Sequence, residues 1–200
     1  MRVAVADYGA GNLRSLCAAL ARAGADPFVT TDETEVREAP LAVVAGVGHV
    51  ASAADGLTRT GVGAALRERS EAGRPVFGIC VGMQLLFGES EEGGRGLELL
   101  PGVVRRLQAG RVPHMGWNAL EPLRVTALLD GLAGADVYFA HSYAAEPEQK
   151  GVIVAEVEHE GRVVAAVERG AIAGVQFHPE RSGPAGARVL ANVMRWSRSA

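Results

Sequence analysis

The sequence contains only two cysteines, Cys17 and Cys80, among its 200 residues. Two cysteines are too few for a disulfide framework, and these two form no C-x-x-C pair of the kind that binds zinc or carries redox chemistry. No apolar run reaches the ~18 residues that span a bilayer. The sequence therefore predicts neither a disulfide-stabilised secreted domain nor a membrane-anchored protein, and a reducing cytoplasm is the expected location.

Lysine and charge of one sign are also scarce. The only lysine is Lys150, and no G-x-x-x-x-G-K-[ST] segment is present, which excludes phosphoryl transfer by a P-loop. The 20 basic and 23 acidic residues are mixed along the chain and give a net charge of −3. No basic surface that would favour nucleic acid or an anionic membrane is therefore expected. With 48% apolar and 22% charged residues, the composition is that of a globular protein and excludes disorder.

The first half of the chain alternates short β-rich runs with helical periodicity, which predicts βαβ units and a parallel sheet. After residue 97 the runs become shorter and no long helix separates them, so an antiparallel or mixed extension of the sheet is expected. Ser182 is expected to cap a last helix. We predict one domain over residues 1–200, an α/β fold of three layers with an open, mixed, mostly parallel sheet flanked by helices. The expected strands are 2–6, 27–30, 40–45, 75–79, 97–107, 136–140, 152–158, 162–168 and 172–177, and the expected helices begin near residue 12, cover 62–70 and 81–87, and follow Ser182.

The two cysteines have different surroundings. Cys17 lies on the apolar stripe of the first predicted helix and is expected to pack in the core. Cys80 stands in Gly78-Ile79-Cys80-Val81-Gly82, a G-x-nucleophile-x-G spacing between a predicted strand and a predicted helix. Such a turn strains the backbone of the central residue and leaves its sulfur exposed, while a helix N-terminus favours a thiolate. We interpret Cys80 as a nucleophile; the alternative is a buried core cysteine.

A base for this thiol is expected from the segment Gln176-Phe177-His178-Pro179-Glu180. His178 and Glu180 are two residues apart in an extended segment, so their side chains point to the same side and the carboxylate can orient the imidazole. This predicts a Cys-His-acid triad; a histidine with only a structural role is the alternative. Zinc-dependent deamination is excluded because no cysteine follows position 80. We expect no metal and no cofactor.

Acyl transfer also requires donors to an oxyanion. Two backbone sources are available: the N–H of Val81, and the loop Gly46-Val47-Gly48 with the N–H groups of Val47 and Gly48. Both follow predicted parallel strands at their carboxyl ends, where open α/β sheets bind ligands. An ordinary turn between strand and helix is the alternative for the glycine loop.

Six blocks of sequence carry a resemblance to a known family. They are Asp7 to Asn12, Gly46 to His49, Gly78 to Phe87, Pro113 to Asn118, Tyr138 to Tyr143 and Gly174 to Glu180. In these blocks, which extend over nearly the whole chain, the sequence resembles the class I (triad-type) glutamine amidotransferases. The first and fourth blocks are similar to the branch formed by the glutaminase subunits of imidazole glycerol phosphate synthase, an enzyme of histidine biosynthesis.

The resemblance implies a flavodoxin-like, class I glutamine amidotransferase fold, glutamine as the substrate, and a thioester at Cys80. It also implies a heterodimer with a (β/α)₈-barrel cyclase subunit, because released ammonia must be kept from water and the chain has no acceptor domain of its own. The residues implied in these roles are Cys80, His178 and Glu180 in catalysis, Gly46, Gln84, Glu92, His141, Ser142 and Tyr143 in substrate binding, and Asn12, Met115 and Trp117 at the partner interface.

Two departures from the family pattern are Ala45, where proline generally precedes the glycine loop, and Val81, where leucine is usual. Without the proline, the loop is expected to be more mobile. Two other functions are also compatible with the sequence. One is a stand-alone cysteine hydrolase or a different amidotransferase, and the other is a non-catalytic α/β scaffold. For Trp117, burial in the core is the alternative to an interface.

Overall fold

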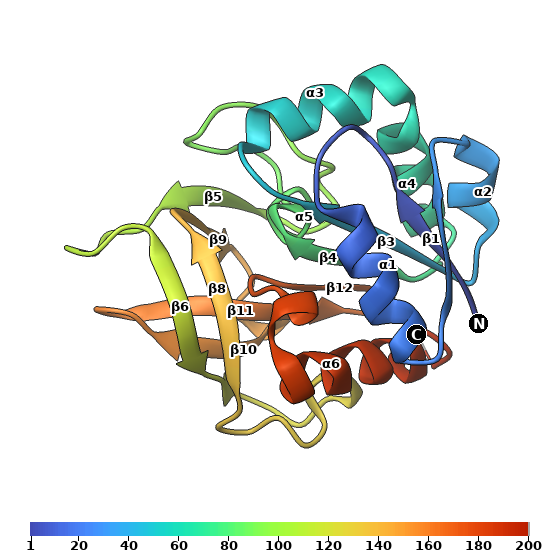
Figure 1. Cartoon of the computed structure of the whole chain (residues 1–200). Coiled ribbons are helices and arrows are strands. Elements are labelled where there is room, and N and C mark those ends of the chain that lie inside the picture. The colour runs from blue at the N-terminus through green and yellow to red at the C-terminus, as the bar shows by residue number, and fades with distance from the viewer. Residues whose placement is uncertain (200) are drawn as a thin grey trace.

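The computed structural model describes residues 1–199, and an eight-stranded mixed sheet forms its centre (Figure 1). Its first five strands, counted from the β2 edge, are parallel, and the last three are antiparallel. The predicted mostly parallel sheet with an antiparallel extension is thereby confirmed. In spatial order the strands are β2 (Asp26–Thr30), β1 (Arg2–Ala6), β3 (Leu41–Gly46), β4 (Val76–Cys80), β12 (Ile172–Val175), β11 (Arg162–Arg169), β10 (Ile153–Glu158) and β7 (Glu121–Pro122).

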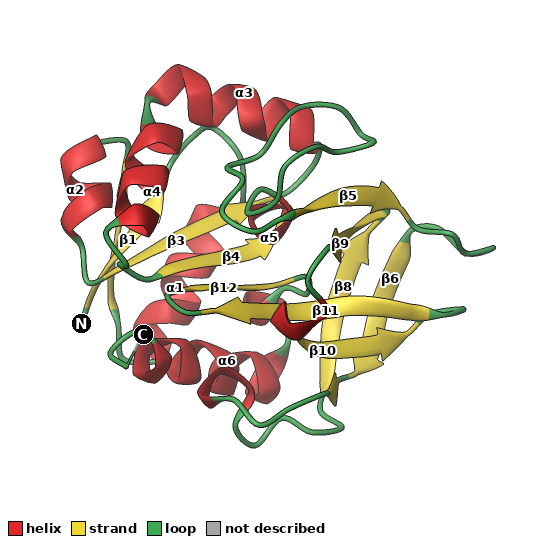
Figure 2. Ribbon diagram, turned by 180° about the vertical axis from the view of Figure 1, so that it is seen from behind, coloured by secondary structure: helices red, strands yellow, loops and turns green. Residues whose placement is uncertain are grey.

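Helices cover both faces of this sheet, as the three-layer prediction requires. Figures 1 and 2 show α1 (Leu13–Arg22) and α6 (Gly183–Trp196) on one face, with α2 (Glu33–Glu38), α3 (Val50–Thr60) and α4 (Val62–Glu71) on the other. Every residue of β3 and β4 is buried, which is expected of parallel strands covered on both faces. The site described below lies where these two strands end.

Two small antiparallel sheets stand beyond the carboxyl ends of the parallel strands (Figure 2). One pairs β5 (Gly102–Arg106) with β9 (Tyr143–Pro147), and the other pairs β6 (His114–Ala119) with β8 (Asp136–His141). The runs 97–107 and 136–140 were expected to extend the main sheet, and this expectation is wrong for both. Within residues 1–199, the antiparallel extension consists of β11, β10 and β7.

Several helices differ from the sequence prediction. α2 and α3 were not predicted, and in α3 the reason is that its buried positions are mainly small residues, which give a weak periodic signal. α5 (Val81–Gln84) ends a turn earlier than expected, and Leu85 to Phe87 are buried without continuing it. Short 3₁₀ turns occupy Ala127–Leu129, Lys150–Val152 and Pro179–Arg181.

Two further local expectations need correction. Ser182 precedes α6 as predicted, but its hydroxyl does not cap the helix: it donates to the carbonyl of His178 over 2.6 Å and accepts from the N–H of Tyr138 over 2.9 Å. The last parallel strand ends at Val175 and not at 177. Cys17 is half-buried against the core, in line with a packing role. Among residues 1–199, no helix combines the length and apolar character needed to cross a bilayer.

Candidate active site

Cys80 lies in the predicted sharp turn between β4 and the one-turn helix α5. Its backbone has φ 54° and ψ −113°, a region that L-residues other than glycine rarely occupy. The flanking glycines permit this geometry, because a Cβ on Gly78 would come within 2.6 Å of the Gly82 carbonyl oxygen and a Cβ on Gly82 within 1.8 Å of the Val44 carbonyl oxygen. Strain held in this way by close backbone packing is typical of functional positions.

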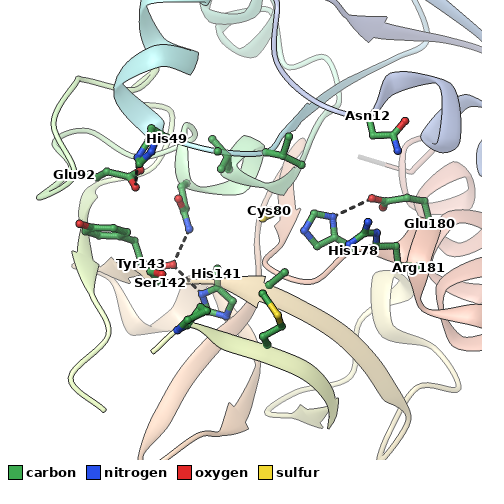
Figure 3. Close-up of a pocket in the computed structure, with 17 residues that line it drawn as sticks. Asn12, His49, Cys80, Glu92, His141, Ser142, Tyr143, His178, Glu180 and Arg181 are labelled. Carbon is green, nitrogen blue, oxygen red and sulfur yellow. Dashed lines mark hydrogen bonds and ion pairs between the residues drawn. The ribbon is translucent and has the colours of Figure 1, made fainter. Parts of the chain in front are cut away.

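The sulfur is less accessible than the sequence suggests. Cys80 is only 3% exposed, so the expectation of an exposed sulfur is wrong, but the residue borders a cavity of about 510 Å³ (Figure 3). Since α5 has a single turn, the macrodipole expected from a longer helix is correspondingly small. Activation of the sulfur must therefore come mainly from the side chains around it.

His178 and Glu180 form the predicted pair beside Cys80. The Nδ1 atom of His178 lies 2.9 Å from Oε1 of Glu180, and both side chains are almost fully buried. Burial lowers the pKa of His178, but the hydrogen bonds to Cys80 and Glu180 and the negative charges of both partners outweigh burial and raise the pKa to about 10. The arrangement thus favours an imidazolium at neutral pH.

One cavity brings together residues that are far apart in the sequence. Of the fifteen residues selected from the sequence, only Gly46 and Trp117 are not part of its lining. Gly46 is nevertheless adjacent, since it pairs with Cys80 across β3 and β4. The lining includes Asn12, Val47, Gly48, Cys80, Val81, Gln84, Glu92, Met115, His141, Ser142, Tyr143, His178 and Glu180, and also His49, Pro113, Ala140 and Arg181.

A chain of polar side chains connects the cavity wall to Cys80. The Nε2 atom of Gln84 donates to the backbone carbonyl of Tyr143 over 2.7 Å and to Oε1 of Gln176 over 3.0 Å. The Nε2 atom of Gln176 in turn contacts Sγ of Cys80 at 3.7 Å. Because both protons of the Gln84 amide are used, its oxygen is the atom left to accept a hydrogen bond from a ligand.

Glu92 supplies a carboxylate on the side of the cavity opposite His178 and Glu180 (Figure 3). Its side chain is 12% exposed, and its two oxygens are held by Nδ1 of His49 at 2.8 Å and by the N–H of Val50 at 2.7 Å. Val50 is the first residue of α3, so the carboxylate also caps that helix. A fixed negative charge in a cavity suits the ammonium group of an amino acid.

The glycine loop reaches the cavity directly after β3. Gly48 has φ +87°, a conformation that favours glycine. Behind the loop, the hydroxyl of Tyr8 donates to the carbonyl of Ala45 over 2.8 Å. A Cβ on Gly46 would lie 2.7 Å from that hydroxyl, so the position is restricted to glycine. The backbone of Val47, Gly48 and Val81 therefore borders the same space as the sulfur.

Met115 and Trp117 lie on the outer face of β6 and are 64% and 58% exposed. The alternative of a core tryptophan is therefore wrong. Trp117 packs its edge against Tyr138 with ring centroids 6.0 Å apart. Large exposed apolar side chains at the rim of a cavity are typical of interaction surfaces.

Some residues of the site were not identified from the sequence. His49 follows the glycine loop directly, and Gln176 is two residues before His178 on one extended segment, so spacing alone contained a signal for both. Tyr8 and His114 had no such signal, because their partners are distant in the sequence.

Comparisons with known proteins agree with this geometry. Residues 4–196 match the family model described as glutamine amidotransferase class-I. The chain belongs to the class-I glutamine amidotransferase family.

Within that family, similar curated proteins carry the name imidazole glycerol phosphate synthase subunit HisH. The protein from Moorella thermoacetica is 47% identical over 194 residues, covering 95% of this chain and 92% of that relative. The protein from Carboxydothermus hydrogenoformans is 46% identical over 193 residues, covering 94% of this chain and 96% of that relative.

Solved structures show the same fold at lower sequence identity. A crystal structure of a glutamine amidotransferase aligns with a TM-score of 0.80 and 22% identity over 98% of both chains. The structure of PurLQS from Thermotoga maritima aligns with a TM-score of 0.77 and 20% identity, also over 98% of both chains.

Proposed function

We propose that this chain is the glutaminase subunit of an imidazole glycerol phosphate synthase. It hydrolyses glutamine to glutamate and ammonia and passes the ammonia to a cyclase subunit in histidine biosynthesis. The observation that carries the proposal is the strained Cys80 with the hydrogen-bonded pair His178 and Glu180 in a cavity that also holds the Glu92 carboxylate. The names of the 47% and 46% identical relatives support the particular synthase.

The reaction begins with attack of the Cys80 thiolate on the carboxamide carbon of glutamine. The negative charge that develops on the amide oxygen is stabilised by the backbone N–H groups of Val47, Gly48 and Val81. His178 gives the proton on Nε2 to the departing nitrogen, the C–N bond breaks, and ammonia leaves a glutamyl thioester. Nε2 has this role because Nδ1 is bonded to Glu180.

Water completes the cycle. Neutral His178 takes a proton from the water, whose oxygen attacks the thioester carbon, and the C–S bond breaks to give glutamate and the thiolate. Glu180 keeps the imidazole oriented and stabilises its positive charge through both steps. No metal or cofactor takes part in this scheme.

The amino acid end of the substrate is proposed to bind across the cavity. Glu92 and the side-chain oxygen of Gln84 accept hydrogen bonds from the α-ammonium group, and the backbone of His141, Ser142 and Tyr143 contacts the α-carboxylate. Gly46 keeps the loop close to the sulfur. The two fixed acceptors explain why the site would prefer an amino acid to a simple amide.

The acceptor of the ammonia is proposed to be a (β/α)₈-barrel cyclase subunit in a heterodimer. Ammonia that enters water at neutral pH is mostly protonated and no longer nucleophilic, so it requires a shielded route. Asn12 and Met115 line the mouth of the cavity and Trp117 is exposed beside it, which supports docking of the partner there. We place the protein in the cytoplasm, where thiols remain reduced.

The test is glutamate release from glutamine by the purified chain, alone and then with the cyclase subunit and its nucleotide ligand. Cys80→Ala is the blank. We expect low release alone and a rise on addition of the liganded partner. Equal and high release in both conditions would favour a stand-alone amidohydrolase, and no release in either would favour a non-catalytic scaffold.

A further inference from the structure

Two buried histidines outside the triad lie next to each other, His141 in the cavity wall and His114 outside the lining. His114 on β6 is 4% exposed and His141 at the end of β8 is 6% exposed. Nδ1 of His114 lies 3.0 Å from Nε2 of His141, and the β6–β8 register places the two residues directly opposite each other. Neither the sharp turn at Cys80 nor the triad requires such a pair.

The donor and the acceptor of each hydrogen bond in this pair can be deduced from the groups at the two ends of the chain. Nδ1 of His141 lies 2.9 Å from the backbone carbonyl oxygen of Tyr143, which can only accept, so this nitrogen carries a proton. Nε2 of a neutral His141 is then an acceptor, and Nδ1 of His114 must donate to it. Nε2 of His114 is left to accept from the amide nitrogen of Asn118 at 3.3 Å.

The surroundings favour neutral rings. Burial lowers the pKa of His141 to about 3, and burial together with the charge of His159 lowers the pKa of His114 to about 4. The plane of His114 is fixed by stacking between Phe139 and His159, with ring centroids 4.5 Å and 4.1 Å away. Because the rings of His114 and His159 are stacked, their nitrogens do not point toward a common centre, as metal ligands would. No group of three potential metal ligands occurs within residues 1–199.

We propose that His114 is a positioning residue for glutamine binding: it donates to His141, holds His141 in the Nδ1–H form, and through it fixes the Tyr143 carbonyl at the cavity wall. The inference rests on the proposed glutaminase function. It assigns a role to a histidine that touches neither the cavity nor the sulfur.

The Tyr143 carbonyl connects this chain of hydrogen bonds to the cavity. It accepts from His141 and also from Gln84, whose second proton goes to Gln176 beside Cys80. If His141 carried its proton on Nε2, it would oppose the Nδ1 proton of His114 and leave Tyr143 with one donor. Gln84 and the backbone at the α-carboxylate site would then lose their fixed geometry.

The kinetic test compares His114→Phe with His159→Phe in the complex with the cyclase subunit. Phenylalanine at 114 keeps the stacking but removes both hydrogen bonds of that ring. Phenylalanine at 159 also keeps the stacking, and it removes only an exposed hydrogen bond to the Arg111 carbonyl, outside the chain from His114 to Tyr143. We expect KM for glutamine to rise about tenfold in His114→Phe with kcat within about twofold of wild type, as for loss of uniform binding. His159→Phe should resemble wild type, and His114→Asn, which keeps a donor near Nδ1, should recover most of the loss.

A second readout does not depend on activity. ¹⁵N NMR of the imidazoles at pH 7 should show both rings neutral with the proton on Nδ1, and His141 should lose that form in His114→Phe. Protons on Nε2 in the wild type, or an unchanged KM in His114→Phe, would overturn the proposal. Failure of the proposed function would be visible separately, as a wild-type complex that releases no glutamate.

Discussion

The hydroxyl of Tyr8 donates to the backbone carbonyl of Ala45 over 2.8 Å, at the point where β3 passes into the glycine loop. Proline at position 45 would fix φ there, and its absence predicted a more mobile loop. The buried hydrogen bond opposes that mobility, because it holds the next peptide unit, between Ala45 and Gly46, against Tyr8. Tyr8 is itself 1% exposed, and burial raises its pKa, so the phenol remains a donor.

Tyr8→Phe tests this anchor. The substitution leaves the Ala45 carbonyl buried without its donor, which costs about 1–3 kcal/mol. We expect the free energy of unfolding to fall by that amount in urea titrations, and the partner-stimulated kcat to fall because the loop is less well held. Unchanged stability together with unchanged kcat would show that the hydrogen bond does not anchor the loop.

The Glu92 carboxylate is held by both His49 and the Val50 N–H, so removing one of these partners should raise KM for glutamine only slightly. Glu92→Gln removes the charge that would face the substrate ammonium, and we expect KM for glutamine to rise about 10- to 100-fold, as for a hydrogen bond to a charged group. His49→Ala leaves the Val50 N–H in place, and we expect a rise of about threefold. Steady-state kinetics at saturating partner measures both, and a larger effect for His49→Ala would contradict this order.

We expect His178 to set the alkaline limit of activity. Its pKa is raised to about 10 in the folded chain, so the imidazolium that would protonate the departing ammonia is present at neutral pH and is lost as pH rises through about 10. The contribution of His178 to the free energy of unfolding is also lost at high pH. It is complete below the pKa of about 6.5 that His178 has in the unfolded chain, and it disappears as pH rises past its pKa in the folded chain. The pH profile of kcat/KM checks this, and an alkaline limb near pH 7 would contradict it.

The neutral histidine pair predicts sensitivity to acid. The pKa values of His114 and His141 are lowered by folding, so the stability they contribute is complete above about pH 6.5 and falls as pH decreases toward the folded values. Each titrating ring adds a slope of about 1.4 kcal/mol per pH unit. Urea unfolding at pH 7 and pH 5 should show a shallower loss in His114→Phe than in the wild type. Equal losses would contradict the lowered pKa values.

The positions of Cys80, His178 and Glu180 were predictable from the sequence because they depend on local spacing. The glycines around Cys80 and the two-residue separation of His178 and Glu180 determine where these side chains point once the strands are recognised. The parallel strands were also predictable, since full burial leaves continuous apolar runs such as Leu41 to Ala45.

Features that depend on contacts distant in the sequence were not predictable in this way. The pairing of β6 with β8, which brings His114 to His141, joins segments separated by a long irregular connection that no periodic pattern identifies. The burial of Cys80 likewise results from packing of neighbouring elements and not from the turn itself. In α3, the close approach of Gly56 to the Tyr8 backbone requires a small residue, and small residues weaken the helical pattern.

The most direct measurement uses a glutamine analogue that carries an electrophile in place of the amide, followed by mass spectrometry of the labelled peptides. The chain provides its own control, because Cys17 is the other free cysteine, lies on α1 outside the cavity, and has a pKa raised by burial. We expect one label at Cys80, prevented by excess glutamine and absent from Cys80→Ala. Equal labelling of Cys17 and Cys80, or labelling of Cys80 that glutamine does not prevent, would contradict a glutamine-binding nucleophile at this position.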